Sequence, residues 1–221
     1  MAMLGFTLIA LLSLTPLAGA EGERASGTLV DGTGRAIGTV RLEQRGTGVT
    51  VGVTFQGVDV VKPGEHGIHL HAVGRCDGPD FTTAGGHFNS TAKQHGLQNP
   101  QGAHAGDLSN LVVGPGTATR GGYSYQATAA GVTLAPGPAS LFDADGAALV
   151  IHANPDDHVT DPAGNSGPRV ACAVLALNAP GMPNTGAGGA ATRWPGVFLL
   201  GALTLTVSML VASALVARRR A

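Results

Sequence analysis

Short runs in which apolar and polar residues alternate, separated by glycine-rich breaks, are the feature that most limits how this chain can fold. Residues 36–45 and 49–55 alternate in this way, as strands with one buried face do. No run shows the sustained 3.6-residue period of an amphipathic helix. Glycine contributes 35 of the 221 residues, about twice its usual share, and can supply the turns between strands. We therefore predict an all-β antiparallel sandwich or barrel over residues 25–178.

The charge of the chain argues against one class of partner. Thirteen Lys and Arg are nearly balanced by 14 Asp and Glu, which gives a formal net charge of −1. A domain that binds nucleic acid usually carries a clustered basic surface. We therefore expect no nucleic-acid partner.

The first 20 residues have the pattern of a signal peptide. Residues 4–18 are almost wholly apolar, and Ala18-Gly19-Ala20 supplies the small residues of a signal-peptidase site, so we expect cleavage after Ala20. No Lys or Arg precedes the apolar run, which departs from the usual pattern. An N-terminal membrane anchor is the alternative, although the run is short for a membrane span.

The C-terminal end has the pattern of a membrane segment. Residues 194–217 carry no charge and are long enough to cross a bilayer, and residues 218–221 form a basic tail expected to stay in the cytoplasm. Residues 179–193 form a Gly- and Ala-rich spacer. Within this spacer lies a motif similar to the LPxTG sorting signal of Gram-positive surface proteins, with Met in place of Leu: Met182, Pro183, Asn184, Thr185 and Gly186.

The resemblance to a sorting signal implies that a sortase cleaves between Thr185 and Gly186 and joins Thr185 to the cell wall. The alternative is a single membrane span that remains in place. Both interpretations export the domain and hold it outside the cytoplasm at the cell surface.

Several histidines occur at spacings typical of metal ligands. His69 and His71 are two residues apart on a predicted strand, so both imidazoles point to one face, as two ligands of one metal would. Two solvated histidines on a polar strand face are the alternative. His152 ends the apolar run 147–151 and is a candidate further ligand of the same metal.

The stretch from residue 75 to residue 105 is rich in Gly, Asn, Gln and His and lacks a regular pattern. Unstructured loops of this length are usually functional. Three of its histidines and one carboxylate just beyond it would complete a tetrahedral ligand set for Zn²⁺, and a bound metal would help to order the loop. These residues are His87, His95, His104 and Asp107. A polar loop that happens to contain histidines is the alternative.

The two cysteines, Cys76 and Cys172, lie far apart and form no CxxC pair. One long-range disulfide is their simplest use. Such a bond needs an oxidising compartment, which agrees with an exported domain.

Several strings in the chain closely resemble those of Cu/Zn superoxide dismutases, in the order and spacing of that family. The resemblance covers residues 25–178 and, with the predicted signal peptide, suggests an exported bacterial type. The strings are residues 66–71 (HGIHLH), 85–89 (GGHFN), 95–96 (HG), 104–108 (HAGDL), 149–152 (LVIH) and 164–172 (GNSGPRVAC).

This resemblance implies an eight-stranded antiparallel Greek-key barrel or sandwich that binds both metals. It makes His69, His71, His87 and His152 the copper ligands. It makes His87, His95, His104 and Asp107 the zinc ligands, so His87 would bridge the two metals. The implied reaction is the disproportionation of superoxide to O₂ and hydrogen peroxide by Cu(II)/Cu(I) cycling.

The resemblance also assigns residues around the metals. Asp156 is similar to a carboxylate that links a copper histidine to a zinc histidine, and Cys76 and Cys172 to the family disulfide. Arg169 resembles the arginine beside the copper, where a fixed cation would attract and position a small anion. With His87 it is the implied catalytic residue.

Some positions fall outside the metal sets or depart from the family pattern. His66 resembles a structural histidine that binds no metal, and His158 matches nothing and is expected to be solvated. Gly86 stands where many members carry Pro. The segment between His152 and Arg169 is short and holds three Asp but no Lys, so electrostatic guidance of the substrate is expected to be weaker or to come from elsewhere.

Two other functions could use the same histidines. A non-enzymatic copper- and zinc-binding protein at the cell surface is one, but metal storage needs no anion-guiding arginine. A copper-free zinc hydrolase is the other, but four histidines around the first metal leave no open zinc position. The sequence leaves open whether the domain is a monomer or a homodimer.

Overall fold

The computed structural model describes residues 22–56, 60–114 and 122–179. None of these residues belongs to a helix that is long and apolar enough to cross a membrane. The predicted signal peptide (residues 1–20), the motif at residues 182–186, the membrane segment 194–217 and the basic tail 218–221 lie outside the described residues.

The described residues form an all-β antiparallel fold, as the alternating runs predict. The strands are β1 (Arg24–Asp31), β2 (Ala36–Arg45), β3 (Gly48–Phe55), β4 (Gly64–His66), β5 (Ile68–His71), β6 (Leu111–Val113), β7 (Tyr123–Ala130), β8 (Ala148–His152), β9 (Arg169–Val174) and β10 (Ala176–Leu177). One short 3₁₀ helix, η1 (Thr82–Ala84), lies in the long loop after β5.

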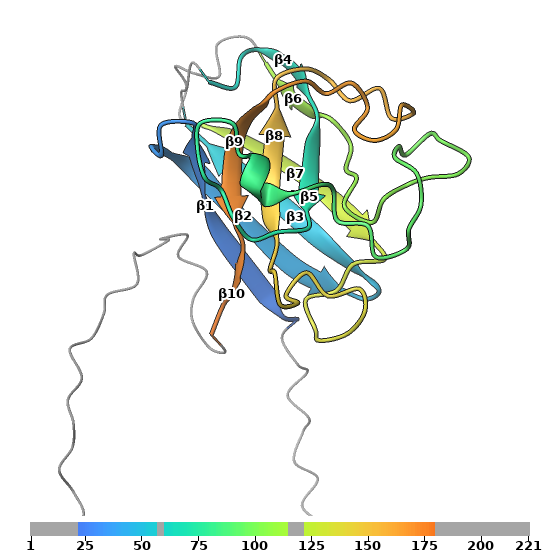
Figure 1. Cartoon of the computed structure of the whole chain (residues 1–221). Coiled ribbons are helices and arrows are strands. Elements are labelled where there is room, and N and C mark those ends of the chain that lie inside the picture. Colours follow the sequence, from blue (N-terminus) through green and yellow to red (C-terminus); the bar gives the residue numbers. More distant parts are fainter. Residues whose placement is uncertain (1–21, 57–59, 115–121, 180–221) are drawn as a thin grey trace, which may run out of the picture. The chain divides into compact units, whose positions relative to one another are not determined.

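Eight strands make one curved antiparallel sheet in the order β5-β8-β9-β1-β2-β3-β7, with β10 paired to β1 (Figure 1). Strands β4 and β6 form a separate two-stranded sheet. The eight-stranded prediction is therefore confirmed for the main sheet. The hydrogen-bonded path is open within the described residues, with β5 and β7 at its ends, so it is not a fully closed barrel.

Alternation along β2 and β3 builds the main core. Leu42 pairs with Val51 and Val40 with Val53, and all four side chains are buried. Because paired residues of antiparallel strands share a face, these pairs put their apolar side chains on the same side of the sheet. The predicted strands 36–45 and 49–55 are thus confirmed, with β3 starting one residue earlier.

Strand β8 is buried on both faces, which explains its nearly continuous apolar sequence. Leu149 and Ile151 belong to the main core. Ala148 and Val150 point to the opposite face, where they pack in a smaller cluster with Phe81 and Cys172. The loop between β5 and η1 therefore covers the outer face of β8 and β9.

The register between β5 and β8 sets the position of three histidines. His69 pairs with Val150 and His71 with Ala148. His152 lies two residues beyond Val150 and so shares its face of β8. The sheet alone thus places these histidines on its outer face, away from the main core.

Two long loops gather beside β5 (Figure 1). The zinc-side loop, residues 87–110, crosses the free edge of β5, because isolated bridges join His71 to His87 and His69 to Asp107. The closing loop, residues 153–168, connects β8 to β9. The two loops are hydrogen-bonded to each other, from the Gln98 N–H to the His158 carbonyl, 3.0 Å.

Candidate metal centre

Four histidines bring one ring nitrogen each into a buried cluster. The four ligand atoms lie within 4.8 Å of one another. His69 Nδ1 and the Nε2 atoms of the other three are buried and have no hydrogen-bond partner within the described residues. We call this group the four-histidine cluster; its members are His69, His71, His87 and His152.

The opposite ring nitrogens of three of these histidines are all hydrogen-bonded. His69 Nε2 lies 2.8 Å from Asp156 Oδ2, and the Nδ1 atoms of His71 and His152 lie 3.0 Å from the carbonyls of Gly85 and Gly167. A ring N–H that donates there leaves the lone pair of the other nitrogen facing the centre of the cluster.

These unpartnered nitrogens form a donor set that fits copper. A buried polar atom without a partner costs about 1–3 kcal/mol, and four such atoms at one point are unusual in a folded protein. Imidazole nitrogens are good ligands for copper. A cation held at this point would satisfy all four at once.

A second cluster contains three histidines and one aspartate, again with ligand atoms within 4.8 Å of one another. Asp107 Oδ1 lies 2.9 Å from His87 Nδ1, 3.1 Å from His95 Nδ1 and 3.4 Å from His104 Nδ1. A tetrahedron with Zn–N distances of 2.0–2.1 Å has edges of about 3.3–3.4 Å, so the spacing and the donor set fit zinc. We call this the histidine–aspartate cluster.

Asp107 also holds the zinc-side loop by its second oxygen. Oδ2 accepts the backbone N–H of Gly96, 2.8 Å, and of His104, 3.0 Å. Both oxygens of the buried carboxylate are therefore engaged, and the loop that carries the three histidines of this cluster is folded around it. This arrangement explains how a long polar segment with no strand of its own becomes ordered.

His87 belongs to both clusters. Its Nδ1 atom faces Asp107 and lies 3.4 Å from His104 Nδ1, while its buried Nε2 faces the four-histidine cluster. The ring is stacked on His69, with centroids 3.9 Å apart. A single imidazole thus separates two possible metal positions and offers one nitrogen to each.

Asp156 provides a second connection between the clusters. One carboxylate oxygen contacts His69 Nε2 and the other contacts His95 Nε2, 3.0 Å away. The side-chain amide of Asn110 holds the backbone of Asp156 by two hydrogen bonds of 2.9 Å. Gly164 must lack a side chain, because a Cβ atom there would lie 1.7 Å from Asp156 Oδ1.

Burial keeps most of the copper-side histidines neutral. It lowers the pKa of His69 to about 3 and of His152 to about 4, and it also lowers the pKa values of His71 and His87. Neutral imidazole is the form that binds a metal.

The histidine–aspartate cluster has the opposite electrostatic character. Burial lowers the pKa of His95, but hydrogen bonds with Asp107 and Asp156 outweigh it and raise the value to about 9. Burial raises the pKa values of the two carboxyls, whereas hydrogen bonds from the histidines lower both well below the usual range. Asp107 and Asp156 therefore both carry negative charge beside these histidines, which a bound cation can neutralise.

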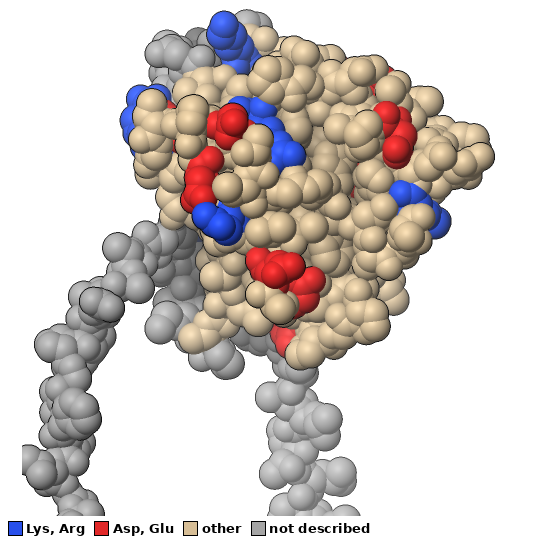
Figure 2. Space-filling view, in the orientation of Figure 1, with Lys and Arg blue, Asp and Glu red and all other residues tan. Residues whose placement is uncertain are grey.

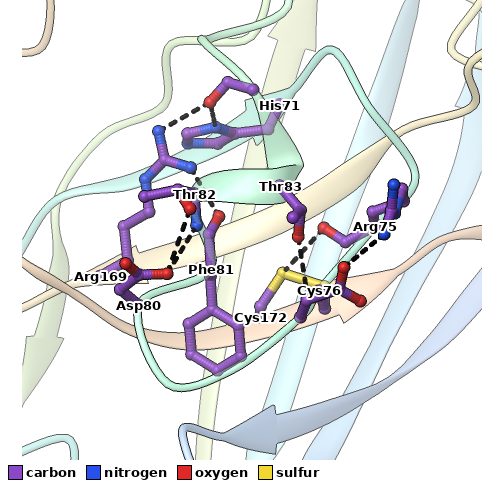
Figure 3. The surroundings of a disulfide bond; sticks show 11 residues. His71, Arg75, Cys76, Asp80, Phe81, Thr82, Thr83, Arg169 and Cys172 are labelled. Carbon is purple, nitrogen blue, oxygen red and sulfur yellow. Dashed lines mark hydrogen bonds and ion pairs between the residues drawn. A yellow bond between two sulfur atoms is a disulfide. The ribbon is translucent and has the colours of Figure 1, made fainter.

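Arg169 begins β9 and reaches toward the four-histidine cluster (Figure 3). Its guanidinium donates hydrogen bonds to the Phe81 carbonyl, 2.7 Å, and to the Gly85 carbonyl, 2.6 Å. The Gly85 carbonyl also accepts from His71. Burial lowers the arginine pKa and the nearby Asp80 raises it, and the group stays protonated at neutral pH.

The predicted disulfide is confirmed. Cys76 and Cys172 are bonded, with Cα atoms 5.7 Å apart, and join the loop after β5 to the middle of β9 (Figure 3). The bond lies beside Phe81 in the smaller core cluster. It therefore fixes the segment whose carbonyls hold Arg169.

The structure brings together every histidine and carboxylate of the two predicted ligand sets. His66 lies outside both clusters, and its ring hydrogen-bonds to the carbonyls of Lys62 and His152. The expectation that His158 is solvated is wrong: its side chain is 15% exposed and its Nδ1 lies 3.4 Å from Asp156 Oδ2. The backbone N–H of His158 also donates to Asp156 Oδ1, 2.7 Å, which holds the residue beside that carboxylate.

Sequence reasoning missed Asn110, Gly164 and the carbonyls of Gly85 and Gly167. Asn110 follows the HAGDL string by two residues and Gly164 opens the last string, but neither residue type indicates by itself which carboxylate or ring it contacts. Only the contacts between loops reveal these roles.

Comparison with known proteins agrees with this geometry. The family model of copper/zinc superoxide dismutase matches residues 36–175. A Cu-Zn superoxide dismutase of Aquifex aeolicus is 43% identical over 148 residues, which are 66% of this chain and 84% of that protein. One of Caulobacter vibrioides is 40% identical over 153 residues, which are 68% and 84% of the two chains.

A solved structure has the same fold. The crystal structure of a superoxide dismutase-like protein from Bacillus subtilis superposes with a TM-score of 0.63 at 34% sequence identity, and the match covers 68% of this chain and 97% of that one. Copper and zinc are the cofactors that the matching family implies, and the two clusters can accommodate them. On these grounds the chain belongs to the copper/zinc superoxide dismutase family.

Proposed function

We propose that the protein is an extracytoplasmic superoxide dismutase whose copper is held by the four-histidine cluster and whose zinc is held by the histidine–aspartate cluster. The observation that carries this assignment is the position of His87, which presents Nε2 to one cluster and Nδ1 to the other. His69, His71 and His152 complete the copper site. His95, His104 and Asp107 complete the zinc site.

Copper supplies the one-electron step, because it cycles between Cu(II) and Cu(I) whereas zinc has no redox chemistry. Overall, two superoxide ions and two protons yield one O₂ and one hydrogen peroxide. The chain itself has to admit a small anion, position it and supply protons, while keeping the buried histidines in place.

Arg169 is the residue that positions the anion. Two carbonyls hold its guanidinium beside His71, so the cation is fixed before any substrate arrives. A fixed charge near the entry raises the local concentration of a small anion and its rate of capture. When its Nε2 is not bonded to copper, His87 could hold one proton there while Nδ1 stays on the zinc side, which would place that proton on the side where the anion is reduced.

Export and anchoring belong to the same proposal and rest on the sequence. Residues 1–20, the motif at residues 182–186 and the uncharged segment 194–217 support a domain held outside the membrane, either by a sortase through Thr185 or by a retained span. The disulfide between Cys76 and Cys172 agrees with an oxidising compartment. Mass spectrometry of the native C-terminus distinguishes the two anchors, because sortase processing leaves a chain that ends at Thr185.

The activity is tested with the full chain loaded with copper and zinc, by following superoxide decay after pulse radiolysis. We expect Arg169→Ala to lower kcat/KM by about tenfold or more with unchanged copper and zinc content. Arg169→Lys should retain part of the activity that Arg169→Ala loses. Arg45→Ala is the matched control, since Arg45 pairs with Glu43 at the far end of β2. A loaded chain that does not consume superoxide, but holds both metals, would instead support a metal-binding protein without activity.

A further inference from the structure

In most histidines of the metal centre, the ring nitrogen that faces away from the metal position is hydrogen-bonded to the protein. His104 is the exception. His69 and His95 use Asp156, and His71 and His152 use backbone carbonyls. The ring of His104 turns Nδ1 toward the histidine–aspartate cluster and Nε2 outward. Its Nε2 has one carboxylate within ion-pair distance in the described contacts, that of Asp161, 3.9 Å away.

Asp161 also holds the backbone of a second zinc-side histidine. Its Oδ1 atom accepts the N–H of His95 at 2.6 Å. The next N–H along the chain, that of Gly96, goes to Asp107. Consecutive backbone amides of the zinc-side loop are therefore held by two carboxylates, one inside the cluster and one from the closing loop.

Asp161 differs in this respect from its neighbour Asp157, which has the same charge and lies in the same loop. Asp157 accepts from the backbone N–H groups of Val159 and Thr160 and from the Asn165 side chain, all within the closing loop. No described contact joins Asp157 to the zinc-side loop. Asp161 thus contacts the metal-centre histidines, whereas Asp157 only stabilises the turn of its own loop.

We propose that Asp161 is a positioning residue for zinc, which holds the His95 backbone and orients the outer nitrogen of His104 from across the two loops. This inference rests on the proposed zinc site. A carboxylate near the free nitrogen of a metal-bound histidine fixes the orientation of the ring and makes the metal-binding nitrogen more basic. Because the Asp161 side chain is 50% exposed, solvent screens its charge, so the effect is smaller than for a buried partner.

The inference also explains the acidic composition of the closing loop. Asp156 and Asp161 point to the zinc side, and Asp157 folds the loop itself. Their charges therefore serve the cation site and the loop, and guidance of the anion falls to Arg169 on the other side of the centre.

The test compares Asp161→Asn and Asp157→Asn in the full chain, purified in a mild detergent and stripped of metal. Zinc affinity is measured by competition with a chromophoric chelator, and ligand geometry by the visible absorption of Co²⁺ bound in place of zinc. We expect Asp161→Asn to weaken zinc binding about tenfold, at the low end of the range for partners of metal-bound histidines, and to change the Co²⁺ spectrum. Asp157→Asn should stay within about twofold of the unmodified chain in affinity and keep its spectrum.

Zinc affinity of Asp161→Asn within twofold of the unmodified chain would overturn the proposal. An equal loss in both variants would also overturn it, because it would indicate a general effect on the closing loop. Thermal unfolding of the metal-free variants shows whether Asp161→Asn is folded before metal is added. If the unmodified chain takes up copper but no zinc, the zinc assignment itself fails and the role of Asp161 fails with it.

Discussion

The two halves of the metal centre are built in different ways. In the four-histidine cluster, three of the four residues lie on the neighbouring strands β5 and β8, and the sheet register alone brings His69, His71 and His152 together. In the histidine–aspartate cluster, every residue lies in the zinc-side loop, which has no strand before β6. His87 enters from that loop and belongs to both.

The two halves also differ in the charge of the groups that surround the histidines. Ring nitrogens on the strand side hydrogen-bond to carbonyls or to Asp156 and stay neutral, whereas the loop side is organised around buried carboxylates that need positive charge nearby. A sheet can hold an empty site in shape, because its backbone bonds do not depend on the ligand. A loop folded around carboxylates depends on the cation for part of its stability.

Replacing His87 with Ala gives the largest expected effect, because it removes the one ring that the two halves share. We expect both copper and zinc to be lost and superoxide dismutation to fall by more than about 100-fold, because a shared ligand is removed and not merely a partner of a ligand. The matched variant His71→Ala should lose copper but keep zinc. Metal analysis together with the activity assay measures both, and a His87→Ala protein that retains full zinc would contradict the bridging role.

Selective removal of zinc should loosen the zinc-side loop and leave the strands that carry the copper-side histidines unchanged. The backbone N–H groups of His95, Gly96 and His104 donate to carboxylates of the zinc side, so without the cation we expect their hydrogen exchange to become about tenfold faster or more. Amides of β8 should change little, because this strand is paired on both sides, with β5 and with β9. Hydrogen exchange measured by mass spectrometry tests this, and equal acceleration in both regions would contradict the difference between the two halves of the metal centre.

Neutralising Asp80 is expected to have the smallest effect and concerns the side that meets the substrate. Asp80 is exposed beside Arg169 and is held by the N–H and hydroxyl of Thr82 (Figure 3). Its negative charge opposes capture of an anion, so Asp80→Asn should raise kcat/KM by about twofold at low ionic strength and lose this gain at high salt.

The control for Asp80→Asn is Glu43→Gln, since Glu43 pairs with Arg24 and Arg45 at the opposite end of the sheet. A rate increase in both variants would point to net charge alone. Charges of both signs are scattered over the face shown in Figure 2 and form no continuous basic patch. Individual charges close to Arg169 therefore matter more than the overall field.

The sequence predicted the strand half of the site well, because its information is local. Alternation identified β2 and β3, and the two-residue spacing of His69 and His71 placed both on one face. The resemblance of several strings to the family implied the full ligand sets. It did not predict how the halves are held together. The contacts of Asn110 with Asp156 and of Asp161 with His95 join residues 46 and 66 positions apart. Gly164 makes room for Asp156, and all three residue types are common in ordinary turns.

The position of His87 is tested most directly by a crystal structure of the chain loaded with copper and zinc, with anomalous difference maps collected at both metal edges. We predict copper at bonding distance from His87 Nε2 and zinc at about 2.0–2.1 Å from His87 Nδ1. Two metals that share no histidine, or a His87 ring bound to only one of them, would contradict it.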